Sequence, residues 1–188
     1  DLCGGTGSWS TPYKEAGYDV RVITLPDYDV LKYKPPRNVY GILAAPPCDQ
    51  FSFAKTTGKP RDLESAWAIV RACLDIIAMC NQIETPYAKT TTLKFWALEN
   101  PHGLLKRFLG KPCYTFNPYD FGDHYKKQTH LWGYFNNPKK NPIHCDNVKF
   151  DRMKSKDIHG EYFGKYSRAV RRAITPKGFS RAFYLANK

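Results

Sequence analysis

The fold is decided by residues 40–48, which read Tyr40-Gly41-Ile42-Leu43-Ala44-Ala45-Pro46-Pro47-Cys48. A short apolar run that ends in a Pro-Pro pair is typical of a buried strand that stops abruptly. In an open α/β sheet, ligands bind beyond the carboxyl ends of the strands. We therefore expect the Cys48 thiol to stand where a nucleophile can meet a substrate, although most free cysteines are simply small buried hydrophobes.

Strand and helix signals alternate on both sides of this run. We expect strands at residues 18–25, 38–45, 94–98, 114–117 and 130–135, and helices at residues 11–17, 62–82, 101–109 and 175–187. The helix at 62–82 has apolar residues at every third or fourth position, which gives it one buried stripe. The alternation predicts an α/β fold with a mostly parallel central sheet.

The charge of the chain favours a polyanionic partner. It has 29 Lys and Arg against 17 Asp and Glu, a net charge of +12, which points to nucleic acid above all. Residues 139–188 alone carry a net charge of +9. The interleaved aromatic residues Phe150, Tyr162, Phe163 and Tyr166 suit phosphate contact combined with base stacking.

Cysteine usage and the absence of targeting signals indicate the compartment. The six cysteines form no CxxC pair, and the sequence shows neither a signal peptide nor an apolar stretch of membrane length. We expect an intracellular protein that binds no metal and no membrane.

Residues 1–8, Asp1-Leu2-Cys3-Gly4-Gly5-Thr6-Gly7-Ser8, place a glycine turn between a strand and a helix. Glycines let the backbone approach a ligand, and the amino end of a helix favours negative charge. A plain tight turn explains the glycines equally well. Ser10 stands where a dinucleotide fingerprint needs its third glycine, which disfavours a nicotinamide cofactor. Because the chain opens inside this motif, we expect a further strand upstream of Asp1.

Glu99-Asn100-Pro101 ends a second apolar strand. A glutamate among apolar neighbours has a raised pKa and can serve as a proton donor. Asn100 in front of Pro101 also fits the cap of a helix. Both interpretations are open at this point.

These three motifs, in this order, resemble those of the DNA (cytosine-5) methyltransferases, and most of all the small enzymes encoded by bacteriophages. The resemblance runs from Asp1 to Asn187 and leaves residues 134–174 unmatched. It implies a Rossmann-like, S-adenosylmethionine-dependent methyltransferase fold with helices on both faces of the sheet. It also implies a catalytic core at 1–135, a basic and reduced target-recognition region at 136–174, and a C-terminal helix at 175–188 that returns to the cofactor pocket.

The resemblance implies transfer of a methyl group from S-adenosylmethionine to carbon 5 of cytosine in DNA. Cys48 would be the nucleophile that adds to carbon 6, and Glu99 the acid. The cofactor would contact Cys3, Gly5, Thr6, Gly7, Ser8, Asp27, Asp29 and Pro46. Nucleic acid would contact Ser52, Lys55, Lys59, Arg61, Lys126, Lys127 and Gln128. We expect a monomer, in the host cytoplasm if a phage encodes it.

Three positions depart from the family pattern, namely Cys3, Asp49 and Gln128. They favour, as an alternative, a degenerate methyltransferase fold that only binds nucleic acid. An RNA cytosine-5 methyltransferase is the other alternative, because the charge suits either polymer. The presence of both Cys48 and Glu99 favours an enzyme, since a binding module has no need for a thiol and an acid at adjacent strand ends.

Overall fold

The computed structural model describes residues 1–56, 58–81, 92–142, 149–150 and 162–188. Its elements are, in chain order, α1 (Thr11–Glu15), β1 (Gly41–Ala44), α2 (Leu63–Cys80), β2 (Phe95–Pro101), α3 (Lys106–Leu109), β3 (Tyr114–Phe116), the 3₁₀ helix η1 (Pro118–Phe121), β4 (Tyr125–Lys126), β5 (Thr129–Tyr134), β6 (Lys149–Phe150), α5 (Arg168–Ala173) and α6 (Lys177–Ala186). Much of the predicted target-recognition region, at 143–148 and 151–161, lies outside the described residues, as does the predicted helix end at Gln82.

A mixed sheet forms the centre of the molecule, with the strand order β1-β2-β5-β3. β1 pairs with β2 in parallel, whereas β5 is antiparallel to both β2 and β3. Leu2 adds two parallel bridges, one to Ala44 and one to Ile23. The α/β class is confirmed, but the regular pairing is one parallel and two antiparallel where the sequence predicted a mostly parallel sheet. The connection from β3 to β5 holds only η1 and β4 and no crossover helix, so β5 returns antiparallel to β3.

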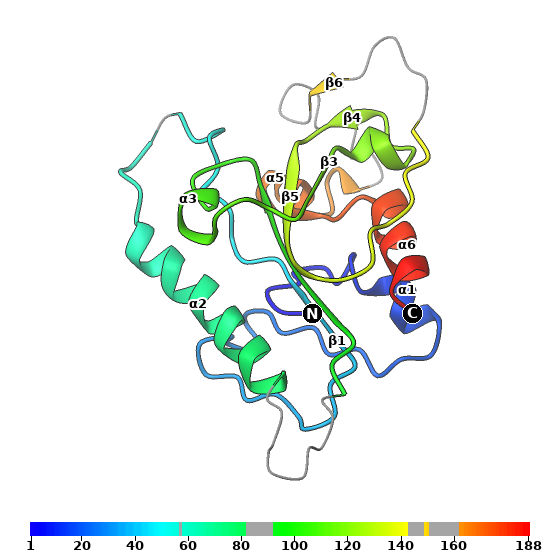
Figure 1. Ribbon diagram of the computed structural model, residues 1–188. Coiled ribbons are helices and arrows are strands. Elements are labelled where there is room, and N and C mark those ends of the chain that lie inside the picture. The colour runs from blue at the N-terminus through cyan, green and yellow to red at the C-terminus, as the bar shows by residue number, and fades with distance from the viewer. Residues whose placement is uncertain (57, 82–91, 143–148, 151–161) are drawn as a thin grey trace.

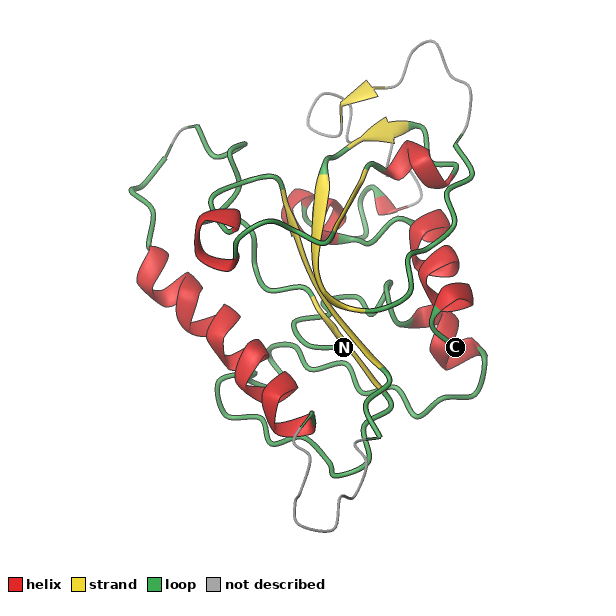
Figure 2. Cartoon of the chain, viewed as in Figure 1, coloured by secondary structure: helices red, strands yellow, loops and turns green. Residues whose placement is uncertain are grey.

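Side chains of the sheet alternate between two hydrophobic cores, because successive residues of a strand face opposite sides. Ile42, Ala44 and Leu98 belong to the core that α2 completes. Leu43 and Ala97 belong to the other core, which the aromatic side chains of α1 and α6 fill. Figures 1 and 2 show this arrangement, with α2 on one face of the sheet and α1 and α6 on the other.

The two longest helices form close to where the sequence predicts them. The Asp62 carboxylate caps α2 by accepting a 3.0 Å hydrogen bond from the Ser65 amide, and Val70 and Cys73 of the predicted stripe are fully buried. α6 follows Pro176 and ends at Asn187. Because α6 packs on η1 and α1, the end of the chain returns to its beginning.

Three predictions about elements need correction. The helix expected at residues 101–109 is reduced to α3, because Pro101 still belongs to β2 and α3 begins only at Lys106. The strand expected at residues 18–25 is reduced to the single bridge at Ile23, since its partner Leu2 is followed by Cys3 with a φ of 55°, which turns the chain out of the sheet. The sequence predicts no helix in the region 136–174, yet α5 (Arg168–Ala173) lies there. The Ser167 hydroxyl caps this helix by accepting a hydrogen bond from the Val170 amide.

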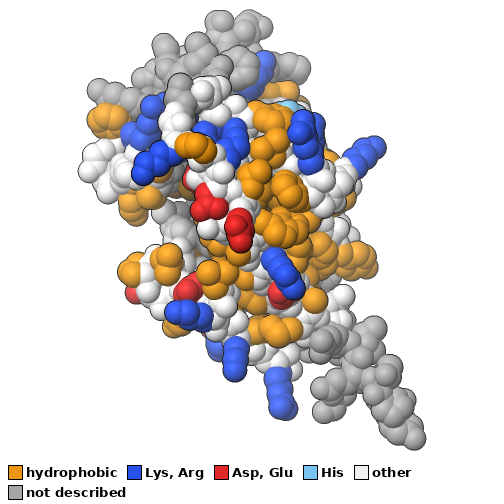
Figure 3. Space-filling view, turned by 90° about the vertical axis from the view of Figure 1, so that its left-hand side faces the viewer, with side chains coloured by type: hydrophobic (Ala, Val, Ile, Leu, Met, Phe, Trp, Pro, Cys, Tyr) orange, Lys and Arg blue, Asp and Glu red, His pale blue; other side chains and the backbone are white. Residues whose placement is uncertain are grey.

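The face of the molecule that carries α2 shows hydrophobic side chains gathered in a strip, with lysine and arginine side chains around it (Figure 3). Trp67 of α2 stacks on Phe108 of α3 here, with ring centroids 5.2 Å apart. In the part of the chain that the structure describes, no helix has the length and apolar character needed to span a bilayer.

Candidate active site at the carboxyl ends of β1 and β2

The chain turns sharply after β1, and this turn carries Cys48. The carbonyl of buried Pro46 accepts a 3.0 Å hydrogen bond from the Asn100 side-chain amide, which links the turn to β2. The carbonyl of Cys48 accepts from the amides of Phe51 and Ser52, at 3.1 and 2.8 Å. The side chain of Phe51, which follows Cys48 in this turn, is fully buried in the core. Cys48 is therefore held half-buried beside the end of β2.

Glu99 and Asn100 lie within β2, at the edge where Cys48 stands. Asn100 is fully buried, and its Oδ1 has no hydrogen-bond partner among the described residues. The interpretation of Asn100 as a helix cap is wrong, because α3 begins only at Lys106 and Leu105 occupies its N-cap position. Asn100 instead ties β2 to the turn that holds the thiol.

The electrostatics show that the thiol and the acid lie near each other. Burial is the largest influence on Cys48, and it raises the pKa of the thiol. The negative charges of Glu99 and Asp49 raise that pKa further, whereas Lys127 and Arg172 lower it. Burial likewise raises the pKa of the Glu99 carboxyl, and the Lys127 ammonium opposes this shift. Lys127 thus acts on both groups.

Lys127 is fixed in place by the C-terminal part of the chain. Its Nζ donates a 2.6 Å hydrogen bond to the main-chain carbonyl of Arg172, in α5. Lys127 was predicted to contact nucleic acid, but the structure brings it to the thiol and the acid. Sequence reasoning missed Arg172 altogether. Its position three residues before the predicted C-terminal helix at 175–188 was the available signal.

Lys126 and Gln128, the residues on either side of Lys127, make different contacts. Lys126 lies over the ring of Tyr119, 5.9 Å from its centroid. The side chain of Gln128 is exposed, and its carbonyl accepts a hydrogen bond from the amide of His102. These two predicted nucleic-acid contacts therefore do not join the Cys48 cluster.

The glycine turn is built around the carboxylate of Asp1. A Cβ atom on Gly4 would lie 2.4 Å from the Asp1 Cγ, so only glycine fits there. Ser10 donates a 2.6 Å hydrogen bond to the same carboxylate. Beyond it, Gly5 has a φ of 55° and faces open space, and Thr6 is exposed. At Gly5 the backbone of the turn is therefore exposed, with no side chain covering it.

The far side of the turn is attached to the start of α6. The buried Gly7 carbonyl accepts hydrogen bonds from both the amide and the hydroxyl of Thr11, each at 2.9 Å. The next residue, Ser8, accepts a 2.8 Å hydrogen bond from the Thr175 amide through its hydroxyl. This contact joins two motifs that lie 167 residues apart in the sequence.

Of the two candidate acidic residues, Asp29 lies by the turn. Its charge acts on the Cys3 thiol, whose pKa is lowered chiefly by a hydrogen bond with the buried Cys73. Asp27 is exposed, and no described contact joins it to the turn. The structure therefore brings together Cys3 and Asp29 with the glycines and leaves Asp27 outside.

The loop after Cys48 is held by Arg61. Its guanidinium donates to the main-chain carbonyls of Gln50, Ser52 and Lys55, the last two at 3.0 Å. Arg61, predicted to contact nucleic acid, therefore braces its own loop. Lys55 donates to the Gln50 side chain, whereas Lys59 is exposed.

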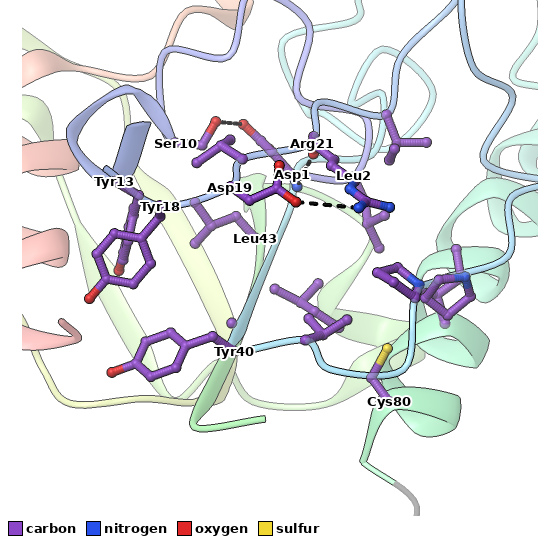
Figure 4. Close-up of a pocket in the computed structure, with 18 of the residues that line it drawn as sticks. Asp1, Leu2, Ser10, Tyr13, Tyr18, Asp19, Arg21, Tyr40, Leu43 and Cys80 are labelled. Atoms are coloured by element: carbon purple, nitrogen blue, oxygen red, sulfur yellow. Dashed lines mark hydrogen bonds and ion pairs between the residues drawn. The ribbon is translucent and has the colours of Figure 1, made fainter. Parts of the chain in front are cut away.

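A separate cavity of about 530 Å³ opens at the opposite, amino ends of the strands (Figure 4). Tyr18 and Tyr40 stand at one side of it, and the 3.3 Å ion pair of Arg21 with Asp19 lies at another. Its lining contains none of the predicted catalytic, cofactor-binding or nucleic-acid-binding residues. The cavity is thus distinct from the Cys48 cluster.

Comparison with known proteins adds nothing to this geometry. Among the described residues, no group of three or more His, Cys, Asp and Glu side chains is arranged to hold a metal ion. No protein-family model matches the chain, and no curated protein matches it in sequence.

Proposed function

We propose that this chain transfers a methyl group from S-adenosylmethionine to carbon 5 of cytosine in DNA, through Cys48 and Glu99. One observation carries the proposal. A half-buried thiol and a half-buried carboxyl lie at adjacent strand ends; the charge of Glu99 acts on Cys48, and the Lys127 ammonium acts on both. Strongly perturbed groups of this kind cluster at functional sites.

The strand order supports a Rossmann-like methyltransferase fold. The segment at Leu2 lies between two parallel partners, Ile23 on one side and Ala44 of β1 on the other. The chain therefore runs first to one side of Leu2 and then crosses to the other side. Such a reversal is a topological switch point, and ligands of open α/β sheets bind beyond the carboxyl ends of the strands there. The glycine turn and Cys48 both follow the strands that flank this point.

The residues present fit S-adenosylmethionine. The bare backbone at Gly5, with open space above it, can receive a ligand that a side chain would exclude. Cys3, Ser8 and Asp29 would line the same place, and Pro46 would adjoin it. When bound there, S-adenosylmethionine supplies an electrophilic methyl group.

Cys48 and Glu99 have different roles in this reaction. Carbon 5 of cytosine is too weak a nucleophile to accept a methyl group directly. After losing its proton, the Cys48 sulfur adds to carbon 6 while Glu99 gives its proton to ring nitrogen 3, so electron density moves to carbon 5. Once carbon 5 is methylated, a base removes its hydrogen as a proton, the carbon–sulfur bond breaks and Glu99 recovers its proton.

The surroundings of Glu99 and Cys48 suit the role of each in this reaction. A raised pKa keeps the Glu99 carboxyl protonated at higher pH, which a proton donor requires. Its neutral form also removes one of the charges that oppose the Cys48 thiolate, while Lys127 favours that thiolate. The target base must be unstacked, because neither group can reach a cytosine inside a duplex.

Transfer of labelled methyl groups tests the proposal. The chain is incubated with labelled S-adenosylmethionine and duplex DNA, single-stranded DNA or RNA, and compared with Cys48→Ser and with Cys113→Ser as the control at an exposed cysteine. We expect label in DNA from the parent and the control, and none from Cys48→Ser. DNA that contains 5-fluorocytosine should trap a covalent complex, because its carbon 5 carries no removable proton.

The other outcomes identify the alternatives. Label in RNA but not in DNA would make the chain an RNA cytosine-5 methyltransferase. Binding of nucleic acid with no transfer to any polymer and no trapped complex would reject the enzyme in favour of a binding module.

A further inference from the structure

Arg171, in α5, is a buried arginine whose guanidinium lacks hydrogen bonds at two of its nitrogens among the described residues. The residue is 7 % exposed, and neither Nε nor Nη1 has a hydrogen-bond acceptor among the described residues. The guanidinium lies over the ring of Phe163, whose centroid is 4.7 Å from the guanidinium carbon. A guanidinium keeps its charge in proteins, so it cannot escape the cost of burial by losing a proton.

No acidic residue in this part of the chain can supply the missing acceptor. Residues 162–188 contain seven Lys and Arg and no Asp or Glu. A buried charge is normally paired, and an arginine fork matches the oxygens of a phosphate or carboxylate. The unused donors of Arg171 therefore indicate an anion that comes from a ligand.

The position of Arg171 connects it to the candidate active site. The next residue, Arg172, acts on the Cys48 thiol and accepts the hydrogen bond of Lys127. Phe163, whose ring the guanidinium covers, is 50 % exposed, and Tyr166, which forms a β-bridge with Phe163, is 44 % exposed. Exposed aromatic rings among basic residues are typical of surfaces that hold the phosphates of a nucleic acid and stack its bases.

We propose that Arg171 and Phe163 form a binding site for one backbone phosphate of a nucleic-acid strand, close to the base that Cys48 attacks. The strand's place beside Cys48 rests on the proposed function. The phosphate oxygens accept hydrogen bonds from the Arg171 guanidinium, and the half-exposed Phe163 ring stacks on a neighbouring base. The site thus holds the strand and leaves the chemistry to Cys48 and Glu99.

Arg171→Met tests this assignment against Arg181→Met, which removes the same charge from an exposed position of α6. Binding of a fluorescent single-stranded oligonucleotide is measured between about 50 and 200 mM salt, without S-adenosylmethionine. We expect Arg171→Met to weaken binding about tenfold more than Arg181→Met. It should also reduce the slope of log K against log salt by about 0.7, the value for one phosphate on a single strand. Arg171→Lys, which keeps the charge without the fork, should lie between the parent and Arg171→Met.

Melting temperatures separate a ligand site from a structural role. Removal of an unpaired buried charge should leave the melting temperature of Arg171→Met equal to or above that of Arg181→Met. A clearly lower value would mean that Arg171 supports the fold, and would overturn the proposal. Equal loss of affinity in the two variants would overturn it too, as would heparin binding with the same dependence on Arg171.

The outcomes also distinguish this proposal from the proposed function. Methyl transfer with equal binding by Arg171→Met and Arg181→Met would reject the phosphate site alone. Binding that depends on Arg171, in a chain that transfers no methyl group, would reject the enzyme and retain the site.

Discussion

Lys127 donates a 2.6 Å hydrogen bond from its Nζ to the carbonyl of Arg172, and this bond holds an ammonium beside the Cys48 thiol. The contact links the chain just before β5 to α5, so the charge that favours the thiolate depends on the C-terminal part of the fold. The electrostatic state of Cys48 is therefore a property of two distant segments.

Replacement of Lys127 should make Cys48 less reactive. Lys127→Met removes a positive charge that lowers the pKa of the thiol, so the pKa should rise and less thiolate should be present at neutral pH. We expect alkylation of Cys48 by iodoacetamide, followed by mass spectrometry, to slow roughly three- to tenfold. Lys126→Met is the matched control, because that lysine lies over Tyr119, and it should leave the rate unchanged. Equal rates in the two variants would show that Lys127 does not influence the thiol.

Replacement of Glu99 should have the opposite effect on reactivity. At a pH above the raised pKa of Glu99, where the carboxyl is ionised, Glu99→Gln removes a negative charge that raises the pKa of Cys48, so alkylation should become faster by roughly the same factor. Methyl transfer should nevertheless fall by about 10² or more, since glutamine cannot donate a proton to ring nitrogen 3. A variant that loses transfer and also alkylates more slowly would indicate a distorted site.

The same variant should change how stability depends on pH. The pKa of Glu99 is raised in the folded chain, so the folded state holds this proton more tightly than the unfolded state does. Stability from this group is full below the unfolded value of 4.5 and is lost as the pH rises through the raised folded value. The melting temperature of Glu99→Gln should therefore exceed that of the parent increasingly as the pH is raised from about 4.5 towards neutrality. A difference that is constant over this range would contradict a raised pKa.

Local signals predicted the two longest helices, α2 and α6, and the central strands well. The cap at Asp62 and the stripe through Val70 and Cys73 are contained within one segment, so α2 is readable without tertiary information. The directions of the strands were not readable in this way. The antiparallel course of β5 depends on how residues 117–128 fold back, and their sequence carries no signal for strand direction.

The candidate site also has a part that local sequence signals predict and a part that depends on tertiary packing. Cys48 and Glu99 follow apolar strands that a sequence reveals, and the ends of parallel strands meet at one edge, so their proximity could be predicted. The role of Lys127 could not be predicted, because its hydrogen bond to Arg172 joins residues that lie 45 positions apart in the sequence. The burial of Arg171 also depends on tertiary packing, since nothing in its six-residue helix distinguishes it from the arginine that follows.

The bond between Ser8 and Thr175 should couple the glycine turn to the end of the chain. Ser8→Ala removes the acceptor of the Thr175 amide, and loss of one such bond costs about 1 kcal/mol. We expect the melting temperature to fall by about 2–4 °C, as such a loss does in a chain of this size. Thr6→Ala, at an exposed position of the same turn, should leave it unchanged. If the turn binds S-adenosylmethionine, Ser8→Ala should also weaken that binding in calorimetry, because the turn then loses its attachment to the segment that begins α6. Unaltered affinity together with a lowered melting temperature would restrict Ser8 to a role in the fold and move the cofactor site away from this side of the turn.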